Sequence, residues 1–239
     1  MKTVEMPIQI DMDGISIHIS RKPIKHMYMR VHATTGDVRV TAPLRMPLNT
    51  IQTHLSSKRD WIHTVRTRAM RRTKPSPLRM ENGEPIPFLG TSYPLMMHAN
   101  ASINQIIINE RVLHCWTKTA AREDALKKLS GWYKQQMLAL LPALIQKWEP
   151  IIGVSVLAFG VRPMKTRWGS CNVVAHRIWL NLSLIKMPLE CLEYVLVHEM
   201  VHLLEANHSP RFYALMSRFM PTWTVHQKQL TSMNTRDAG

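Results

Sequence analysis

One short pattern in this 239-residue chain combines residue types that can hold a metal ion and activate water: His198-Glu199-x-x-His202. Histidines at positions i and i+4 of a helix lie one turn apart on one face, so both imidazoles can reach the same ion. Glu199 follows the first histidine, which puts its carboxylate where it can take a proton from bound water. The alternative, two core histidines and a buried glutamate, leaves three polar groups unpartnered in an apolar helix. We therefore expect a metal site.

A catalytic zinc site uses three protein ligands and leaves one position open, so a third ligand is needed. Glu205 follows His202 by three residues and shares its face if the helix continues that far. His208 follows His202 by six residues and precedes Ser209-Pro210, a good N-cap and first helical residue, so the first helix should end near Ala206-Asn207. We favour His208 as the ligand. Glu205 then either orients a ligand imidazole or is an ordinary carboxylate at a helix end.

The metal pattern needs a buried helix, and the residues before it predict one. Pro188 suits a first turn, and the run Leu189–Val197 is apolar on most sides by its second half. Other helices are predicted over 48–72, from Thr119 as N-cap with a kink or break at Pro142, and from Pro210 to Pro221. Strands are predicted over 15–20, 27–31, 38–41, 93–98, 105–109, 112–117, 154–159 and 177–182. The first three should form an antiparallel meander.

These elements predict an α+β fold. A β-rich N-terminal half with one long helix, residues 1–118, should pack on a metal-binding half of helices and strands, residues 119–239. Before the strand at 177–182, Trp168-Gly169 indicates a close approach of another group to the backbone, and the alternative is a core tryptophan followed by a turn. Arg162, Lys165 and Arg167 are candidates for positive charge near the metal, and Cys171 is a candidate for a nearby thiol.

The net charge of the chain is +15, which favours polyanionic partners such as nucleic acid or nucleotides. The alternative is a solvated basic surface with no dedicated partner. Part of the excess falls at the end of the predicted helix over 48–72, in Arg66, Arg68, Arg71, Arg72 and Lys74. No stretch reaches the ~20 apolar residues of a membrane-spanning helix, and we expect no membrane partner. The three cysteines have no paired spacing, and the N-terminal residues have no signal-like apolar run. Both features favour a cytoplasmic protein.

The metal pattern and its surroundings resemble the YgjP-like metallopeptidase domain, a relative of the SprT and WLM minimal zincins. The resemblance rests on Val197–Leu203, Glu205–Ser209, Phe212, Lys165–Cys171, Leu180-Asn181, Leu184, Pro188, Tyr194, Gly90, Tyr93 and Trp61-Ile62. It covers roughly residues 25 to 230 and implies one integrated zincin-like domain. It further implies one zinc ion per chain, the ligands His198, His202 and His208, and Glu199 as the catalytic base. The segment between Cys171 and Ile178 lacks the glycine turn common in the family.

Three functions are compatible with these residues. The first is a zinc metallopeptidase that cuts a peptide or protein substrate, because zincins bind an extended substrate along an edge strand beside the metal helix. The second is a metal-dependent hydrolase of nucleotides or phosphorylated small molecules, supported by the charge. The third is a basic, nucleic-acid-associated protein, with protease activity or with a structural zinc. Structural zinc sites are closed by four protein ligands, which argues against a purely structural ion. We favour the peptidase.

Overall fold

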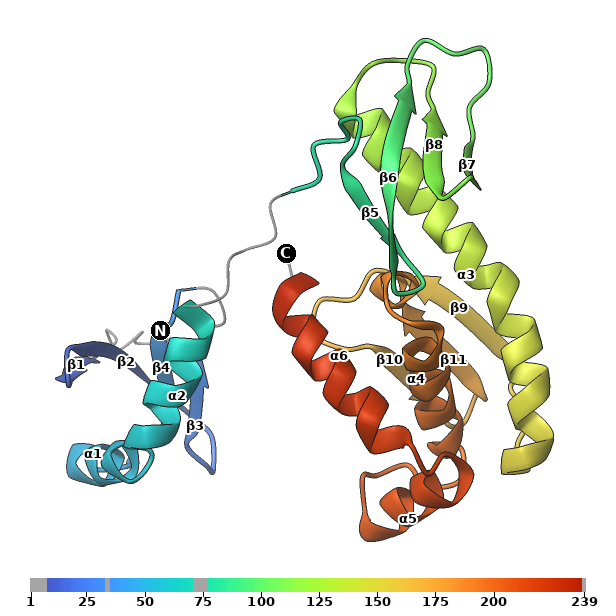
Figure 1. Ribbon diagram of the computed structural model, residues 1–239. Helices are drawn as coiled ribbons and strands as arrows, with labels where there is room; N and C mark the ends of the chain where they lie inside the picture. Colours follow the sequence, from blue (N-terminus) through green and yellow to red (C-terminus); the bar gives the residue numbers. More distant parts are fainter. Residues whose placement is uncertain (1–7, 33–34, 71–76, 238–239) are drawn as a thin grey trace, which may run out of the picture. The chain divides into compact units, whose positions relative to one another are not determined.

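Alternating apolar residues near the N-terminus build a small sheet covered on one face by helices. The computed structural model describes residues 8–32, 35–70 and 77–237, and the chain divides into two compact units, Met1–Pro75 and Ser76–Gly239 (Figure 1). The first unit contains β1 (Ile8–Met12), β2 (Ile15–Lys22), β3 (Tyr28–Val31), β4 (Val38–Pro43), α1 (Leu48–Ser57) and α2 (Arg59–Met70). Its core is formed by Ile15, Ile17, Ile19, Val38, Val40, Ala42, Ile51, Leu55 and Ile62.

The predicted antiparallel meander is wrong, although its strands are present. The order in the sheet is β1-β2-β4-β3, and β2 pairs with β4 in parallel, with Ile17 opposite Val38 and Ile19 opposite Val40. The two strands with fully buried aliphatic faces therefore occupy the centre. β3, which carries the exposed Tyr28 and an exposed arginine, takes the edge, where charged side chains are tolerated.

The single helix predicted over 48–72 is two helices that meet at Lys58. Ser57 Oγ donates to the carbonyl of His54, and the Lys58 amide donates to the carbonyl of Leu55, which tightens and ends α1. Within the described chain, Arg66 and Arg68 fall in α2. The other cations of that cluster, Arg71, Arg72 and Lys74, lie outside the described residues.

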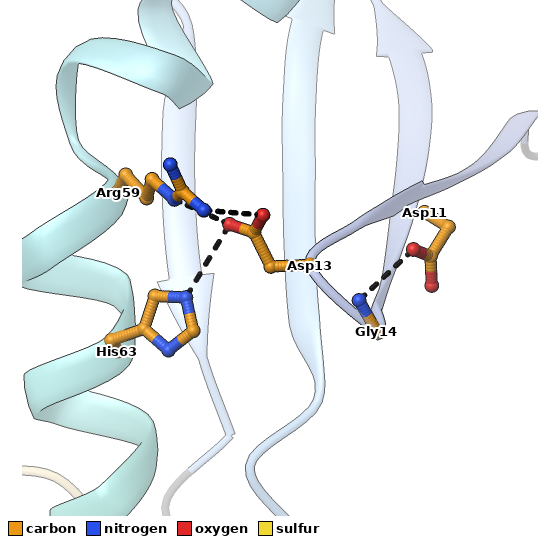
Figure 2. A network of polar contacts seen from close by, with 5 residues as sticks. All are labelled: Asp11, Asp13, Gly14, Arg59 and His63. Carbon is orange, nitrogen blue, oxygen red and sulfur yellow. Dashed lines mark hydrogen bonds and ion pairs between the residues drawn. The ribbon is translucent and has the colours of Figure 1, made fainter.

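An ion pair fastens the β1–β2 turn to α2 (Figure 2). Arg59 donates to both carboxylate oxygens of Asp13 at 2.5 Å, and His63 Nε2 lies 3.5 Å from Asp13 Oδ2. The hydrogen bonds from Arg59 hold the pKa of the Asp13 carboxyl below its usual value. The neighbouring Asp11 accepts the amide of Gly14, so both acids of this turn have partners.

The second unit places two sheets around one core. It contains β5 (Pro85–Phe88), β6 (Thr91–His98), β7 (Ile106–Asn109), β8 (Val112–Trp116), α3 (Arg122–Ile152), β9 (Ala158–Arg162), β10 (Gly169–Asn172), β11 (Arg177–Asn181), the 3₁₀ helix η1 (Leu182–Lys186), α4 (Leu189–Val201), α5 (Pro210–Phe219) and α6 (Trp223–Asp237). The sheets have the orders β5-β6-β8-β7 and β10-β11-β9. One hydrophobic core joins β5–β8, α3 and the helices that follow, so it includes residues on both sides of position 118. The fold is mixed α+β, as predicted.

Three local predictions in this unit differ from the structure. Helix α3 begins at Arg122 rather than directly after Thr119, whose hydroxyl instead accepts the amide of Ala121. The helix then continues through Pro142, so of the predicted kink or break the break is absent. Strand β9 begins at Ala158, where its parallel pairing with β11 starts, instead of at residue 154. No helix in the described part of the chain is both long and apolar enough to cross a membrane.

The β5–β6 turn braces the start of α4. The amide of Leu89 donates to the carbonyl of Ile185 at 2.8 Å, and the amide of Gly90 donates to the carbonyl of Lys186 at 3.3 Å. Gly90 has a φ of +80°, and a Cβ added to it would lie 2.9 Å from Cγ and 3.0 Å from Cα of Pro188. Neither the ring nor the backbone of Pro188 can move away without shifting the helix it opens.

We therefore expect Gly90→Ala to destabilise the protein more than Gly83→Ala. Gly83 has a similar φ of +83°, but no atom lies within 4 Å of its added Cβ. Both substitutions force alanine into the left-handed region, which costs about 1–2 kcal/mol of stability. Only Gly90→Ala adds a steric clash, which costs about 1 kcal/mol or more. Urea denaturation of both variants measures the difference. Equal losses would show that the contact with Pro188 is unimportant.

Candidate metal centre

Helix α4 is buried on nearly all sides, as the apolar run before His198 predicts. It packs against α3, α5, α6, β10, β11 and η1, and nine of its thirteen residues are buried. Pro188 occupies the N-cap position, so the helix begins at Leu189, one residue later than predicted. A hydrogen bond of 2.7 Å from the Trp148 indole to Glu193 ties α3 to α4. The residues at the end of α4 are therefore held by the core itself.

Three histidines meet at the C-terminal end of α4. One ring nitrogen each of His198, His202 and His208 lies within 4.8 Å of the others, and Nε2 of His198 is 3.0 Å from Nε2 of His208. A tetrahedral ion with bonds of about 2.0 Å needs nitrogens about 3.3 Å apart, so small rotations of these rings fit the requirement. Burial lowers the pKa of His198 to about 3 and lowers that of His202 as well. Both rings are therefore neutral at pH 7, the form that binds metals.

Helix α4 ends at Val201, earlier than the predicted end near residue 206. His202 is the C-cap residue, and the chain turns through 203–208 before α5 begins. Ser209 caps α5 by accepting the Phe212 amide, and Pro210 is its first residue, both as predicted. Because the helix stops, the argument that Glu205 shares the face of His202 fails.

Glu205 contacts the site through its main chain rather than its side chain. Its backbone carbonyl lies 3.1 Å from Nδ1 of His202, which fixes the proton on Nδ1 and leaves Nε2 free. The carboxylate instead lies 3.9 Å from a guanidinium nitrogen of Arg211. The backbone carbonyl at position 205 therefore orients the His202 imidazole, a role that was one of two alternatives predicted for the Glu205 carboxylate.

Glu199 is 5% exposed and packs directly on the backbone of β10. A Cβ added to Gly169 would lie 2.6 Å from Glu199 Oε1 and 2.8 Å from its Cγ, so only glycine leaves room for this carboxylate. The close backbone approach predicted at Trp168-Gly169 is therefore present, and the approaching group is Glu199. Burial raises the pKa of Glu199 to about 8, and the charge of Arg167 opposes that rise.

A cleft of about 570 Å³ runs between α4 and β10. It is lined by Arg167, Trp168, Gly169, Ser170, Cys171, Val173, Tyr194, Val195, His198, Glu199, His202, Ala206 and His208. Strand β10 lies at the edge of its sheet. The Trp168 carbonyl accepts the Asn181 amide on the β11 side, so the alternation of an antiparallel ladder turns the amides and carbonyls of Gly169 and Cys171 toward the free edge.

Asn181 holds the segment that leads into β10. This buried amide donates to the carbonyls of Met164 and Arg167 at 2.9 Å, and its oxygen accepts the amide of Ser183. Sequence reasoning gave Asn181 no such role. The feature that could have indicated this role is an amide side chain at the end of an apolar strand.

The candidate cations and the thiol are placed differently from one another. Arg167 lines the cleft, Arg162 stacks on the Trp179 ring at 4.8 Å, and Lys165 is exposed outside the lining. Burial raises the pKa of Cys171 to about 11, so its sulfur stays a thiol, which is a poor metal ligand. In the β10–β11 turn, which lacks glycine, His176 adopts the left-handed conformation with a φ of +46°.

A helix that ends in H-E-x-x-H, beside an edge strand and a third histidine, is the arrangement of metal-dependent hydrolases. The family model of the YgjP-like metallopeptidase domain matches residues 25–233, and the chain belongs to this family. Among solved structures, it is similar to the metallopeptidase zymogen abylysin of Pyrococcus abyssi, with 19% identity and a TM-score of 0.38 over 42% of this chain and 100% of that one. Comparison with curated proteins finds no match. The family makes the protein a metal-dependent peptidase.

The buried carboxylate predicts a pH dependence of the metal-free protein. In the folded chain Glu199 keeps its proton up to a pKa of about 8, whereas the unfolded chain releases it near 4.5. Stability is therefore lost as pH rises through this window, and Glu199→Gln removes the loss. In the presence of chelator, we expect the variant to gain about 1 kcal/mol over wild type per pH unit between pH 5 and 8. Urea denaturation at four pH values checks this, and a constant difference would contradict it.

Proposed function

We propose that the protein is a zinc-dependent peptidase in which His198, His202 and His208 hold one zinc ion per chain and Glu199 is the general base. The observation that carries this proposal is the convergence of three imidazoles beside a buried carboxylate and a free strand edge. Three nitrogen ligands are the donor set of catalytic zinc sites with one open position. A bound zinc ion supplies Lewis acidity and lowers the pKa of its water toward ~7.

Glu199 moves the proton in this proposal. Its carboxylate takes a proton from the attacking water and delivers it to the leaving amine nitrogen of the peptide. Packing on Gly169 limits the side chain to one position, so little reorganisation is needed. The positive charge of Arg167 favours the ionised carboxylate that the first step requires.

The edge of β10 favours a peptide as the substrate. An extended chain can pair with the free main-chain groups of Gly169 and Cys171 and lie across the metal site. Burial raises the pKa of Tyr194 to about 12, so its hydroxyl stays protonated and can donate to the oxyanion that forms. Among the residues that line this cleft, Arg167 is the one lysine or arginine, which suits a peptide better than a polyphosphate.

The direct test is metal analysis and hydrolysis by Glu199→Gln. The amide keeps the shape of the side chain but cannot accept a proton, so we expect normal zinc content and a loss of about 10²–10⁴ in the rate of casein cleavage. Chelator should abolish wild-type cleavage, and added zinc should restore it. Near-normal turnover by the variant would exclude Glu199 as the base, and cleavage of nucleoside triphosphates but not casein would exclude the peptidase.

The ligand set predicts unequal effects of two neighbouring substitutions. His208→Ala removes one of three protein ligands and should weaken zinc binding strongly. Glu205→Ala keeps the backbone carbonyl that holds His202, so it should change zinc affinity by less than about the 10–100-fold typical of losing an outer hydrogen bond to a ligand. Titration with a competing chelator measures both. A larger loss for Glu205→Ala would make Glu205 the ligand in place of His208.

A further inference from the structure

The N-terminal unit contains an apolar hollow that the proposed chemistry does not use. The hollow measures about 520 Å³ and is lined by Lys25, His26, Met27, Met29, Met46, His54, Lys58 and Trp61. Its floor consists of three methionines that are continuous with the core of this unit, and Trp61 is 47% exposed above it. Methionine-rich surfaces adapt to varied apolar side chains. The rim carries two lysines and two histidines, and no acid contributes to the lining.

The hollow lies beside an unpaired strand edge. β3 is the last strand of its sheet, and on the described part of the chain only β4 pairs with it. The amide of His32 donates to the carbonyl of Asp37 on the β4 side, so the alternation of the ladder turns the amides and carbonyls of Met29 and Val31 outward. An extended segment can therefore add to this edge by main-chain hydrogen bonds.

A strand added to β3 would present its side chains alternately to two different surroundings. Residues on the side of Met29 would enter the apolar hollow. Residues on the other side would lie near Arg30, which is directly opposite Arg39 on the open face of the sheet. Like charges in such a pair are destabilising, and neither arginine forms an ion pair with any described residue. Asp37, the nearest acid along the chain to Arg39, accepts a hydrogen bond from Thr35.

The charges decide which occupant fits. A second copy of this chain paired through β3 would bring its own Arg30 to the same face and add to the repulsion. A segment with acids facing Arg30 and large apolar side chains facing the methionines satisfies both faces and the cationic rim. We propose that the β3 edge and its hollow form a docking site for extended protein segments that alternate acidic and large apolar residues. That docked proteins are substrates rests on the proposed peptidase function, whereas the binding itself does not.

The test compares two fluorescein-labelled nine-residue peptides of the same composition. One alternates leucine and glutamate, and the other has its leucines and glutamates in separate blocks. Both have the same charge, so ionic attraction alone binds them equally. By fluorescence anisotropy with the full-length protein in chelator, we expect the alternating peptide to bind at least tenfold more tightly. Working without metal separates this result from any failure of the peptidase proposal.

Three variants locate the site. Val31→Pro removes an outward amide without removing a β3–β4 hydrogen bond and should weaken binding at least tenfold. Trp61→Ala, which leaves the strand intact, should weaken it several-fold. Arg30→Gln should weaken the alternating glutamate peptide about fivefold and leave a leucine–serine counterpart unchanged. Lys134→Gln, an exposed charge on α3, is the matched control and should have no effect. Circular dichroism confirms that each variant is folded.

Four outcomes would overturn the proposal. The first is equal binding of the alternating and block peptides. The second is unchanged binding by both folded Val31→Pro and Trp61→Ala, which would place the peptide elsewhere, for example on β10. The third is displacement of the peptide by a single-stranded oligonucleotide at equal concentration, which would make the face a general polyanion surface. Self-association that depends on Val31 would assign the edge to a second copy instead.

Discussion

The contact between Glu199 and the backbone of Gly169 is the constraint around which the candidate site is built. A buried carboxyl group is unfavourable in its charged form unless it is paired or hydrogen-bonded, and here a strand residue without a side chain lies against it. That contact sets the distance between α4 and β10, and so the width of the cleft. Asn181 holds the segment before Gly169, and the β5–β6 turn holds the start of α4. Elements far apart in the sequence thus hold the short distance between Glu199 and Gly169.

The residues of the candidate site were predictable because each depends on local rules. The i, i+4 spacing of His198 and His202, the cap at Ser209-Pro210 and the glycine after Trp168 all act within a few residues along the chain. The early end of α4 was not predictable, because no glycine or proline lies between Val201 and Pro210. The helix stops where His202 bonds to the carbonyl of Glu205, a contact that exists only once the chain has turned.

Strand positions were predictable and strand order was not. Alternation of apolar residues located β2, β4 and β11 nearly to the residue, since it reports which side chains face a core. It carries no information on which strand lies beside which. The parallel pairing of β2 with β4 depends on matching Ile17 and Ile19 with Val38 and Val40 across twenty residues. The methionine hollow was missed for the same reason, since its lining comes from four separate segments.

The turn between α4 and α5 has a consequence for the role of the ion in folding. An ion held by His198 and His208 would close a ring of only about ten residues, and short rings remove little chain entropy from the unfolded state. The core beneath α4 is already complete without it, because the buried residues of α4 contact one another and α3 through apolar side chains. The ion would therefore link the end of α4 to the start of α5 only locally. Such a local link allows the chain to fold first and bind its metal afterwards.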